Sequence, residues 1–173
     1  SPSRGLGDVY KRQYVDRAFK EEFFHVPFDE RPEYNGVQLI NSKVISSYLR
    51  QLLRNDLAYA PFSMAGMEEP VEEPLEINTP EGTIKIKIGG TIDRMDCKED
   101  TLRIVDYKTG GSPKTPANIE QLFIPAEGRP NYIFQTFLYA AIMSRKQSLK
   151  VAPALLYIHR AANESYSPVI EIG

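Results

Sequence analysis

The chain has 173 residues, of which 42% are hydrophobic and 25% charged, a balance typical of a single soluble globular domain. No apolar run approaches the roughly 20 residues of a membrane-spanning helix, and the first residues lack the apolar stretch of a secretory signal, so we expect a cytoplasmic protein without a membrane partner. The net charge of −2 is unlike that of a globally basic nucleic-acid binder, but it leaves room for a basic channel beside metal-binding carboxylates.

The first thirteen residues, SPSRGLGDVYKRQ, lack the apolar periodicity of the rest of the chain. They resemble the translation of a sequencing adapter, and we therefore expect residues 1–13 to be non-native and exclude them from fold reasoning. Residues 14–173 are expected to form one domain that is truncated at its N-terminus.

Residues 37–59 are predicted to form a long amphipathic helix, because apolar side chains recur there at steps of three and four. Asn41 and Ser42 are its candidate caps. The pattern then changes to short apolar segments that predict three strands, residues 71–78, 83–96 and 101–108. The polar sequences TPEG and CKED are predicted to be the tight turns between them. Together these segments predict an antiparallel meander.

Residues 109–130 are rich in Gly and Pro and are predicted to be a long loop, which in a compact domain is often functional. A second helix is predicted over 131–146 and a core strand over 149–158, with a further candidate strand over 166–172. The order of elements predicts an α/β fold with a central mixed sheet flanked by helices. The buried face of the second helix is expected to consist of Phe134, Phe137, Leu138, Ala141 and Ile142.

Charged side chains stand at the ends of two predicted strands. Asp93 projects from the face opposite to a row of alternating isoleucines, namely Ile84, Ile86, Ile88 and Ile92. The following strand is apolar on both faces, yet it ends in Asp106 and Lys108, which share one face. Gly89 and Gly90 indicate a bend, or a close approach by another backbone, before Asp93.

An ion pair turned to solvent would also explain Asp106 and Lys108, because an Asp-x-Lys string is expected by chance in a chain of this size. A second such string, Asp96-Cys97-Lys98, begins three residues after Asp93. It is placed in a predicted turn with no buried strand behind it. We therefore interpret the second string as accidental.

The combined arrangement resembles the PD-(D/E)XK nuclease superfamily, and most closely its RecB/AddB-like exonucleases. The resemblance rests on a glycine-bent strand ending in IDRMD, a hairpin, a buried strand ending in IVDYKTG and a helix containing QTFLY, over about residues 68–139. It implies a restriction-endonuclease-like core and a metal-dependent DNA nuclease acting in DNA repair or recombination. It also implies DNA as the substrate and a helicase subunit or domain as a partner.

The resemblance implies a role for each residue that matches a motif. Asp93, the last residue of Gly90-Thr91-Ile92-Asp93, and Asp106 are the implied metal ligands, and the backbone carbonyl of Tyr107 is an implied third oxygen. Lys108 is implied to orient and activate the attacking water, a task for which arginine is less suited because it does not lose its proton.

Gln135 and Tyr139 match a Q-x-x-x-Y helix motif and are implied contacts to the site or the DNA. They are four residues apart and so share a helix face; a packing pair between helix and sheet is the alternative. The family also uses an acidic residue before the first strand. We choose Glu68 for this position, with Glu69 and Glu73 as the alternatives.

Oxygen ligands are expected to hold the metal. Cys97 is the only cysteine, which excludes a four-cysteine zinc site and a four-cysteine iron–sulfur cluster. His25 and His159 stand in no spaced motif, and the early-helix histidine of many RecB-like members has no clear match here. Oxygen ligation favours Mg²⁺, Mn²⁺ or Ca²⁺, and Mg²⁺ or Mn²⁺ is the expected cofactor of a nuclease of this resemblance.

Two other functions remain open from the residues alone. The chain could be a catalytically inactive DNA-binding or structural module of a helicase–nuclease complex, which would bind DNA without metal-dependent turnover. It could also be an unrelated α/β binding protein that carries these motifs by coincidence. The intact set of Asp93, Asp106 and Lys108 favours the active enzyme.

Overall fold

The computed structural model describes residues 13–18, 20–21, 35–112, 114–125, 130–163 and 165–172. The chain divides into two compact units, Ser1–Asp56 and Leu57–Gly173, and each is described by itself. In the described ranges, no helix combines the length and hydropathy of a membrane span.

Helix α2 (Gly36–Tyr59) confirms the first predicted helix. Its start differs from the expectation, because the cap is Asn35 rather than Asn41 or Ser42. Asn35 Oδ1 accepts the backbone N–H of Gln38 at 3.0 Å, and the Asn35 N–H donates to Gln38 Oε1 at 2.9 Å. This reciprocal pair satisfies two backbone donors that a helix N-terminus otherwise leaves free.

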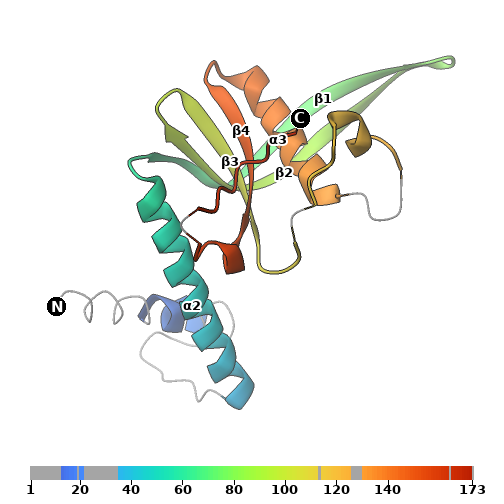
Figure 1. Cartoon of the computed structure of the whole chain (residues 1–173). Coiled ribbons are helices and arrows are strands. Elements are labelled where there is room, and N and C mark those ends of the chain that lie inside the picture. Colours follow the sequence, from blue (N-terminus) through green and yellow to red (C-terminus); the bar gives the residue numbers. More distant parts are fainter. Residues whose placement is uncertain are drawn as a thin grey trace. The chain divides into compact units, whose positions relative to one another are not determined.

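Four strands form one mixed sheet in the order β1-β2-β3-β4, which confirms the α/β expectation (Figure 1). The first three strands are antiparallel, and β4 runs parallel to β3 after a crossover through α3 (Asn131–Lys146). This topology brings the carboxyl ends of β3 and β4 to the same edge of the sheet. The strands are β1 (Ser63–Thr79), β2 (Gly82–Lys98), β3 (Thr101–Lys108) and β4 (Lys150–Tyr157).

The candidate strand over 166–172 is not formed. The segment makes an isolated antiparallel bridge to β4, between Val169 and Ala154. Backbone bonds join it to β4 at Pro168 and Ile170, while Tyr166 attaches through its side-chain hydroxyl. Because Pro168 has no N–H and Tyr166 bonds through its side chain, a regular ladder cannot extend along this segment.

Helix α3 packs across the sheet, chiefly on β4. The expected buried face was only partly right: Ile142 is buried, but Phe134, Phe137 and Leu138 are half-buried and Ala141 is exposed. The stripe is rotated because the small residues Thr136 and Ala140 face the sheet and bring the helix close to it, while the aromatic rings line the margin. The buried residues are Ile133, Thr136, Tyr139, Ala140 and Ile142.

The β1–β2 hairpin continues beyond the sheet as a two-stranded ribbon (Figure 1). The isoleucine row expected on one face is buried only near the sheet, where Ile92 is inaccessible and Ile88 packs against the core. Farther out, Ile84 and Ile86 are exposed, opposite Ile77 and Leu75. The opposite face of the ribbon carries two exposed ion pairs, Lys85 with Glu76 and Lys87 with Glu72.

The string Asp96-Cys97-Lys98 closes strand β2 and does not lie in a turn, which corrects the expectation. Asp96 is 0% exposed and bonds to two guanidinium groups. Arg94 Nε donates to it at 2.8 Å, and Arg103 donates from Nε at 3.0 Å and from Nη2 at 2.8 Å. Arg103 in turn lies 3.7 Å from the centre of the Tyr59 ring. Asp96 is therefore a buried structural anion whose charge arginines from two strands neutralise.

Candidate active site

Asp93 and Asp106 lie opposite one another on β2 and β3. The ladder pairs Arg94 with Val105, and continuing its register by one residue places Asp93 opposite Asp106. The Tyr107 N–H donates to Asp93 Oδ2 at 2.9 Å, so β3 itself positions the Asp93 carboxylate. Partners in an antiparallel ladder share a face, and both carboxylates therefore stand on the same side of the sheet.

Lys108 completes the group from the same face of β3. Its Nζ lies 2.5 Å from Asp106 Oδ2, and the two side chains are only 19% and 17% exposed. The ammonium also lies 4.4 Å from the centre of the Tyr132 ring on α3. The ion pair considered from the sequence does exist, but it is mostly shielded beneath α3 rather than turned to solvent.

Asp106 is held in an environment that disfavours its negative charge. Burial raises the pKa of its carboxyl above the ordinary value, the Lys108 ammonium lowers it, and the Asp93 carboxylate raises it again, with a net increase. Asp106 Oδ2 is shielded from water, and its close contact with Lys108 lacks the geometry of a hydrogen bond. A cation shared with Asp93 would relieve both the desolvation and the repulsion.

Glu68 lies on β1 between Met67 and Glu69, whose partners on β2 are Arg94 and Ile92. The register therefore places it opposite Asp93. Its φ of 51° is in the left-handed region, which is strained for a residue with a side chain. Its side chain is exposed, and no three acidic, histidine or cysteine side chains converge within the described ranges.

The two aspartate carboxylates fit Mg²⁺, which keeps part of its water shell, better than an ion that takes all its ligands from the protein. Asp93 and Asp106 place two carboxylates, both of them oxygen donors, on the same face of the sheet. Mg²⁺ retains several waters and is bound through one or two carboxylates. These two residues could hold such an ion, with Glu68 as the nearest further carboxylate along β1.

Gln135 and Tyr139 contact each other and the sheet. Gln135 Nε2 donates to the Tyr139 hydroxyl at 3.0 Å; the Gln135 side chain is exposed, and Tyr139 is 5% exposed within the core. A β-carbon added to Gly90 would lie 2.0 Å from the Tyr139 hydroxyl, and one added to Gly89 would lie 1.9 Å from the Val71 carbonyl oxygen. Gly89 therefore marks a close approach by another backbone, one of the two expected alternatives, whereas the neighbour of Gly90 is a side chain.

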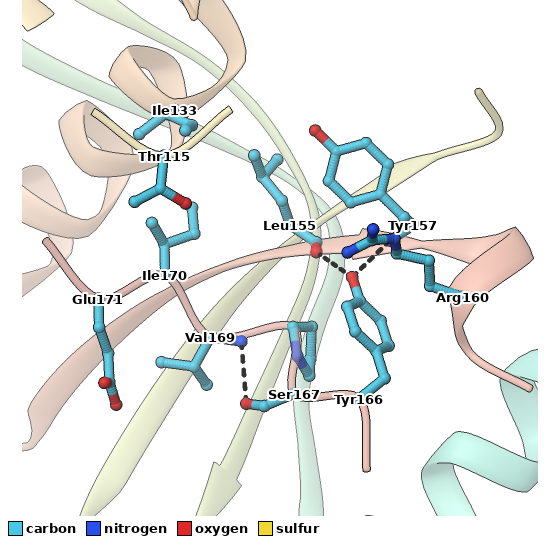
Figure 2. Close-up of a pocket in the computed structure, with 11 residues that line it drawn as sticks. Thr115, Ile133, Leu155, Tyr157, Arg160, Tyr166, Ser167, Val169, Ile170 and Glu171 are labelled. Carbon is cyan, nitrogen blue, oxygen red and sulfur yellow. Dashed lines mark hydrogen bonds between the residues drawn. The ribbon is translucent and has the colours of Figure 1, made fainter. Parts of the chain in front are cut away.

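A cavity of about 390 Å³ lies at the carboxyl end of β4 (Figure 2). Tyr157 and Arg160 line it, and Tyr157 is the ladder partner of Lys108. Neither residue stands in a motif that the sequence marks as functional. The available signal was the position of Tyr157 at the end of a predicted core strand, because ligands of α/β sheets bind at the carboxyl ends of parallel strands.

The histidines add nothing to this carboxylate pair in the described part of the chain. His159 is exposed beside the Tyr157 ring, with ring centroids 6.0 Å apart. His25 lies outside the described residues, and so does the segment 1–13 apart from its last residue, Gln13.

Comparison with known proteins identifies the family of the chain. The family model of the PD-(D/E)XK nuclease superfamily matches residues 3–170, which is nearly the whole chain. No curated protein matches it. The fold agrees as well, since a mixed sheet flanked by helices is the restriction-endonuclease-like core. The chain therefore belongs to the PD-(D/E)XK nuclease superfamily, a family of nucleases.

Proposed function

We propose that this chain is a divalent-cation-dependent deoxyribonuclease of the RecB/AddB type, which hydrolyses DNA phosphodiester bonds in repair or recombination. The proposal is supported chiefly by the positions of Asp93 and Asp106, which the register of β2 and β3 places opposite one another on one face, with Lys108 in contact with Asp106. Membership of the superfamily supports nuclease chemistry. The RecB/AddB assignment is supported by the Gly-x-x-Asp, Asp-x-Lys and Gln-x-x-x-Tyr strings together.

Each residue of the proposed site has a distinct task. Asp93 and Asp106 would hold Mg²⁺ or Mn²⁺, with Glu68 and the Tyr107 carbonyl as further oxygen donors. When bound, the ion supplies charge neutralisation at the phosphate and acidifies a water molecule. Lys108 would orient the attacking water and stabilise the hydroxide with its ammonium. Gln135, whose side chain is exposed beside Tyr139, would contact the DNA backbone.

A cleavage assay on linear DNA with Mg²⁺ or Mn²⁺ tests the proposal. Asp106→Asn and Lys108→Ala should each reduce the rate at least about a hundredfold, the range expected for loss of a group that stabilises transition-state charge or transfers a proton. Asp100→Asn is the matched control, because Asp100 also pairs with a lysine, Lys150, but lies at an exposed turn. Cleavage by Asp106→Asn and by Lys108→Ala at the same rate as by the control Asp100→Asn would refute the proposal.

The nature of the substrate end tests the RecB/AddB assignment separately. An exonuclease degrades linear DNA progressively and leaves a covalently closed circle intact, whereas an endonuclease cuts both. We expect degradation of the linear form only. Cleavage of the closed circle at a similar rate would retain the nuclease and reject this subtype.

A catalytically inactive DNA-binding module of a helicase–nuclease complex is the second candidate. It is favoured by the exposed position of Glu68, since no third acidic group joins the two aspartates within the described ranges. Such a module would bind DNA in the presence of EDTA and show no turnover with either metal ion. The cleavage assay above decides between the two.

A further inference from the structure

The cavity at the carboxyl end of β4 is built from side chains that the proposed site does not use (Figure 2). Its volume of about 390 Å³ is in the range of small-molecule sites. Ile133 from α3, Leu155 from β4 and Ile170 from the C-terminal segment give it apolar walls. The rings of Tyr157 and Tyr166 add aromatic surface, and Arg160 provides a cation.

Hydrogen bonds fix the walls of this cavity. The Tyr166 hydroxyl donates to the Leu155 carbonyl at 2.8 Å and accepts the Tyr157 N–H at 3.0 Å. The same segment is held by backbone bonds from Leu155 to Pro168 and from Ile170 to Pro153. The C-terminal segment is therefore tied to β4 at Tyr166, Pro168 and Ile170, and the Tyr166 ring is held as a preformed wall.

Arg160 gives the cavity a preference for anions. Its side chain is exposed, and no carboxylate pairs with it in the part of the chain that the structure describes. Figure 2 shows Glu171, the acidic residue of the lining, on the far side from the guanidinium. A guanidinium binds phosphate through a planar pair of N–H donors, while flat aromatic and aliphatic surfaces suit a nucleobase.

The cavity lies next to the proposed catalytic residues. Tyr157 is paired with Lys108 across the parallel strands β3 and β4. The pKa of the Tyr157 hydroxyl is raised, mainly by burial, and both Lys108 and Asp106 act on it electrostatically, Lys108 lowering and Asp106 raising it. If the scissile phosphate of a DNA strand binds at Asp106 and Lys108, the cavity is a neighbouring binding site for the next nucleotide of that strand.

We propose that this cavity is a nucleotide subsite, which takes one nucleotide of the DNA strand with its base against the Tyr157 and Tyr166 walls and its phosphate on Arg160. This inference rests on the proposed nuclease function, because it gives a binding place to the part of the DNA strand that extends from the catalytic residues. The occupant is a nucleoside monophosphate unit rather than an isolated anion, since apolar and aromatic side chains line the cavity beside Arg160.

Calorimetric titration of the whole chain in EDTA with thymidine 5′-monophosphate, thymidine and inorganic phosphate tests the subsite. We expect the monophosphate to bind at least tenfold more tightly than either fragment. Arg160→Ala should weaken monophosphate binding about tenfold, which is typical of one lost charge-assisted hydrogen bond, and leave thymidine binding unchanged. Arg145→Ala is the matched control, because Arg145 is an exposed arginine at the end of α3.

A second variant tests the walls. Ile170→Trp fills the cavity and should abolish binding of both thymidine and its monophosphate; if that variant does not fold, Arg160→Ala decides alone. Equal affinity for phosphate and the monophosphate, or wild-type affinity in Arg160→Ala, overturns the subsite.

Cleavage kinetics separate the subsite from the nuclease function. Arg160→Ala should raise the KM for a short oligonucleotide several-fold more than it changes kcat. Normal KM and kcat in this variant overturn the subsite and leave the nuclease intact. Arg160-dependent nucleotide binding in a chain that cleaves no DNA with either metal ion supports the subsite and refutes the nuclease.

Discussion

The hydroxyl of Tyr139 lies directly over the α-carbon of Gly90, at a place where a β-carbon would come within 2.0 Å of it. This contact joins the glycine that precedes Asp93 on β2 to the helix that carries Gln135. Two sequence strings far apart in the chain are thus parts of one packing arrangement. The glycine is required because of the helix above it.

The glycine pair gives the first prediction. Gly90→Ala should destabilise the fold by about 1–3 kcal/mol, the usual cost of overpacking, and Gly89→Ala should cost more, because its obstacle is the Val71 backbone carbonyl. Tyr139→Phe should reduce the cost of Gly90→Ala but not that of Gly89→Ala. Chemical denaturation of the single and double variants measures this coupling. Gly110→Ala, where no atom lies within 4 Å, should be close to neutral.

The buried anion Asp96 gives the second prediction. Asp96→Asn leaves Arg94 and Arg103 without their shared counter-ion, and breaking a buried pair in this way costs about 3–5 kcal/mol. The exposed pair at Lys87 provides the contrast: Glu72→Gln should change stability by less than about 1 kcal/mol. Urea unfolding curves measure both. Similar small losses in the two variants would show that Asp96 is not a structural anion.

The raised pKa of Asp106 gives the third prediction. A carboxyl whose folded-state pKa is raised stabilises the fold below its unfolded pKa, near 4, and that stability is lost as pH rises through the folded value. Asp106→Asn should therefore gain stability over the wild type, in EDTA, as the pH rises from about 3.5 to 7. Thermal melts across this range measure the difference. An unchanged or falling difference would contradict a charge-disfavouring environment at Asp106.

Asp100 supplies a control of opposite sign. Its hydrogen bond and ion pair with Lys150 lower the pKa of its carboxyl. A lowered pKa gives stability above the unfolded value that disappears as pH falls through the folded one. Asp100→Asn should therefore melt slightly below the wild type at pH 7, and the two should converge in acid.

Metal binding gives the fourth prediction. An ion that binds only the folded state raises its stability, by about 2.7 kcal/mol when its concentration is a hundred times the Kd. Mn²⁺ or Mg²⁺ should therefore raise the Tm of the wild type, and the rise should be lost in Asp93→Asn and Asp106→Asn. Asp100→Asn should retain it. A rise of equal size in all four proteins would place the ion elsewhere.

The Tyr166 hydroxyl gives the fifth prediction. Tyr166→Phe removes one acceptor and one donor, so that the Leu155 carbonyl and the Tyr157 N–H lose their partner. The cost should be about 1–3 kcal/mol, measured by denaturation. Ser167→Ala removes only a long contact of 3.4 Å to the Val169 N–H and serves as the control; an equal loss there would argue against an anchoring role for Tyr166.

Local sequence patterns were sufficient to predict the bounds of those elements whose ends are marked by their own residues. Strand β3 and helix α3 have the predicted bounds, because an apolar run on both faces and a helix following Pro130 mark their own ends. Strand β1 begins at Ser63 rather than at residue 71. Its first half contains Pro70 and little alternation, and it is a strand because β2 pairs with it at the edge of the sheet.

The site itself was predictable only in part. Asp106 and Lys108 drew attention because two charges end a buried strand, and they form an ion pair; Asp93 lies opposite Asp106 when the β2–β3 register is continued by one residue. Asp96 could not be interpreted from its sequence neighbours, since one of the two arginines that neutralise it, Arg103, lies on β3. The cavity at Arg160 depends on a C-terminal segment folding back on β4, which no local pattern indicates.

In the outer half of the β1–β2 ribbon the two strands pair with each other and carry exposed apolar side chains, as at Leu75 opposite Ile86. A lone two-stranded hairpin is marginally stable in water, so its amides should exchange hydrogen long before those of β3. Asp93, in contrast, is anchored by the Tyr107 amide at the far end of the same strand. The tip can therefore be trimmed or lengthened by evolution or by engineering while the geometry that holds Asp93 is retained.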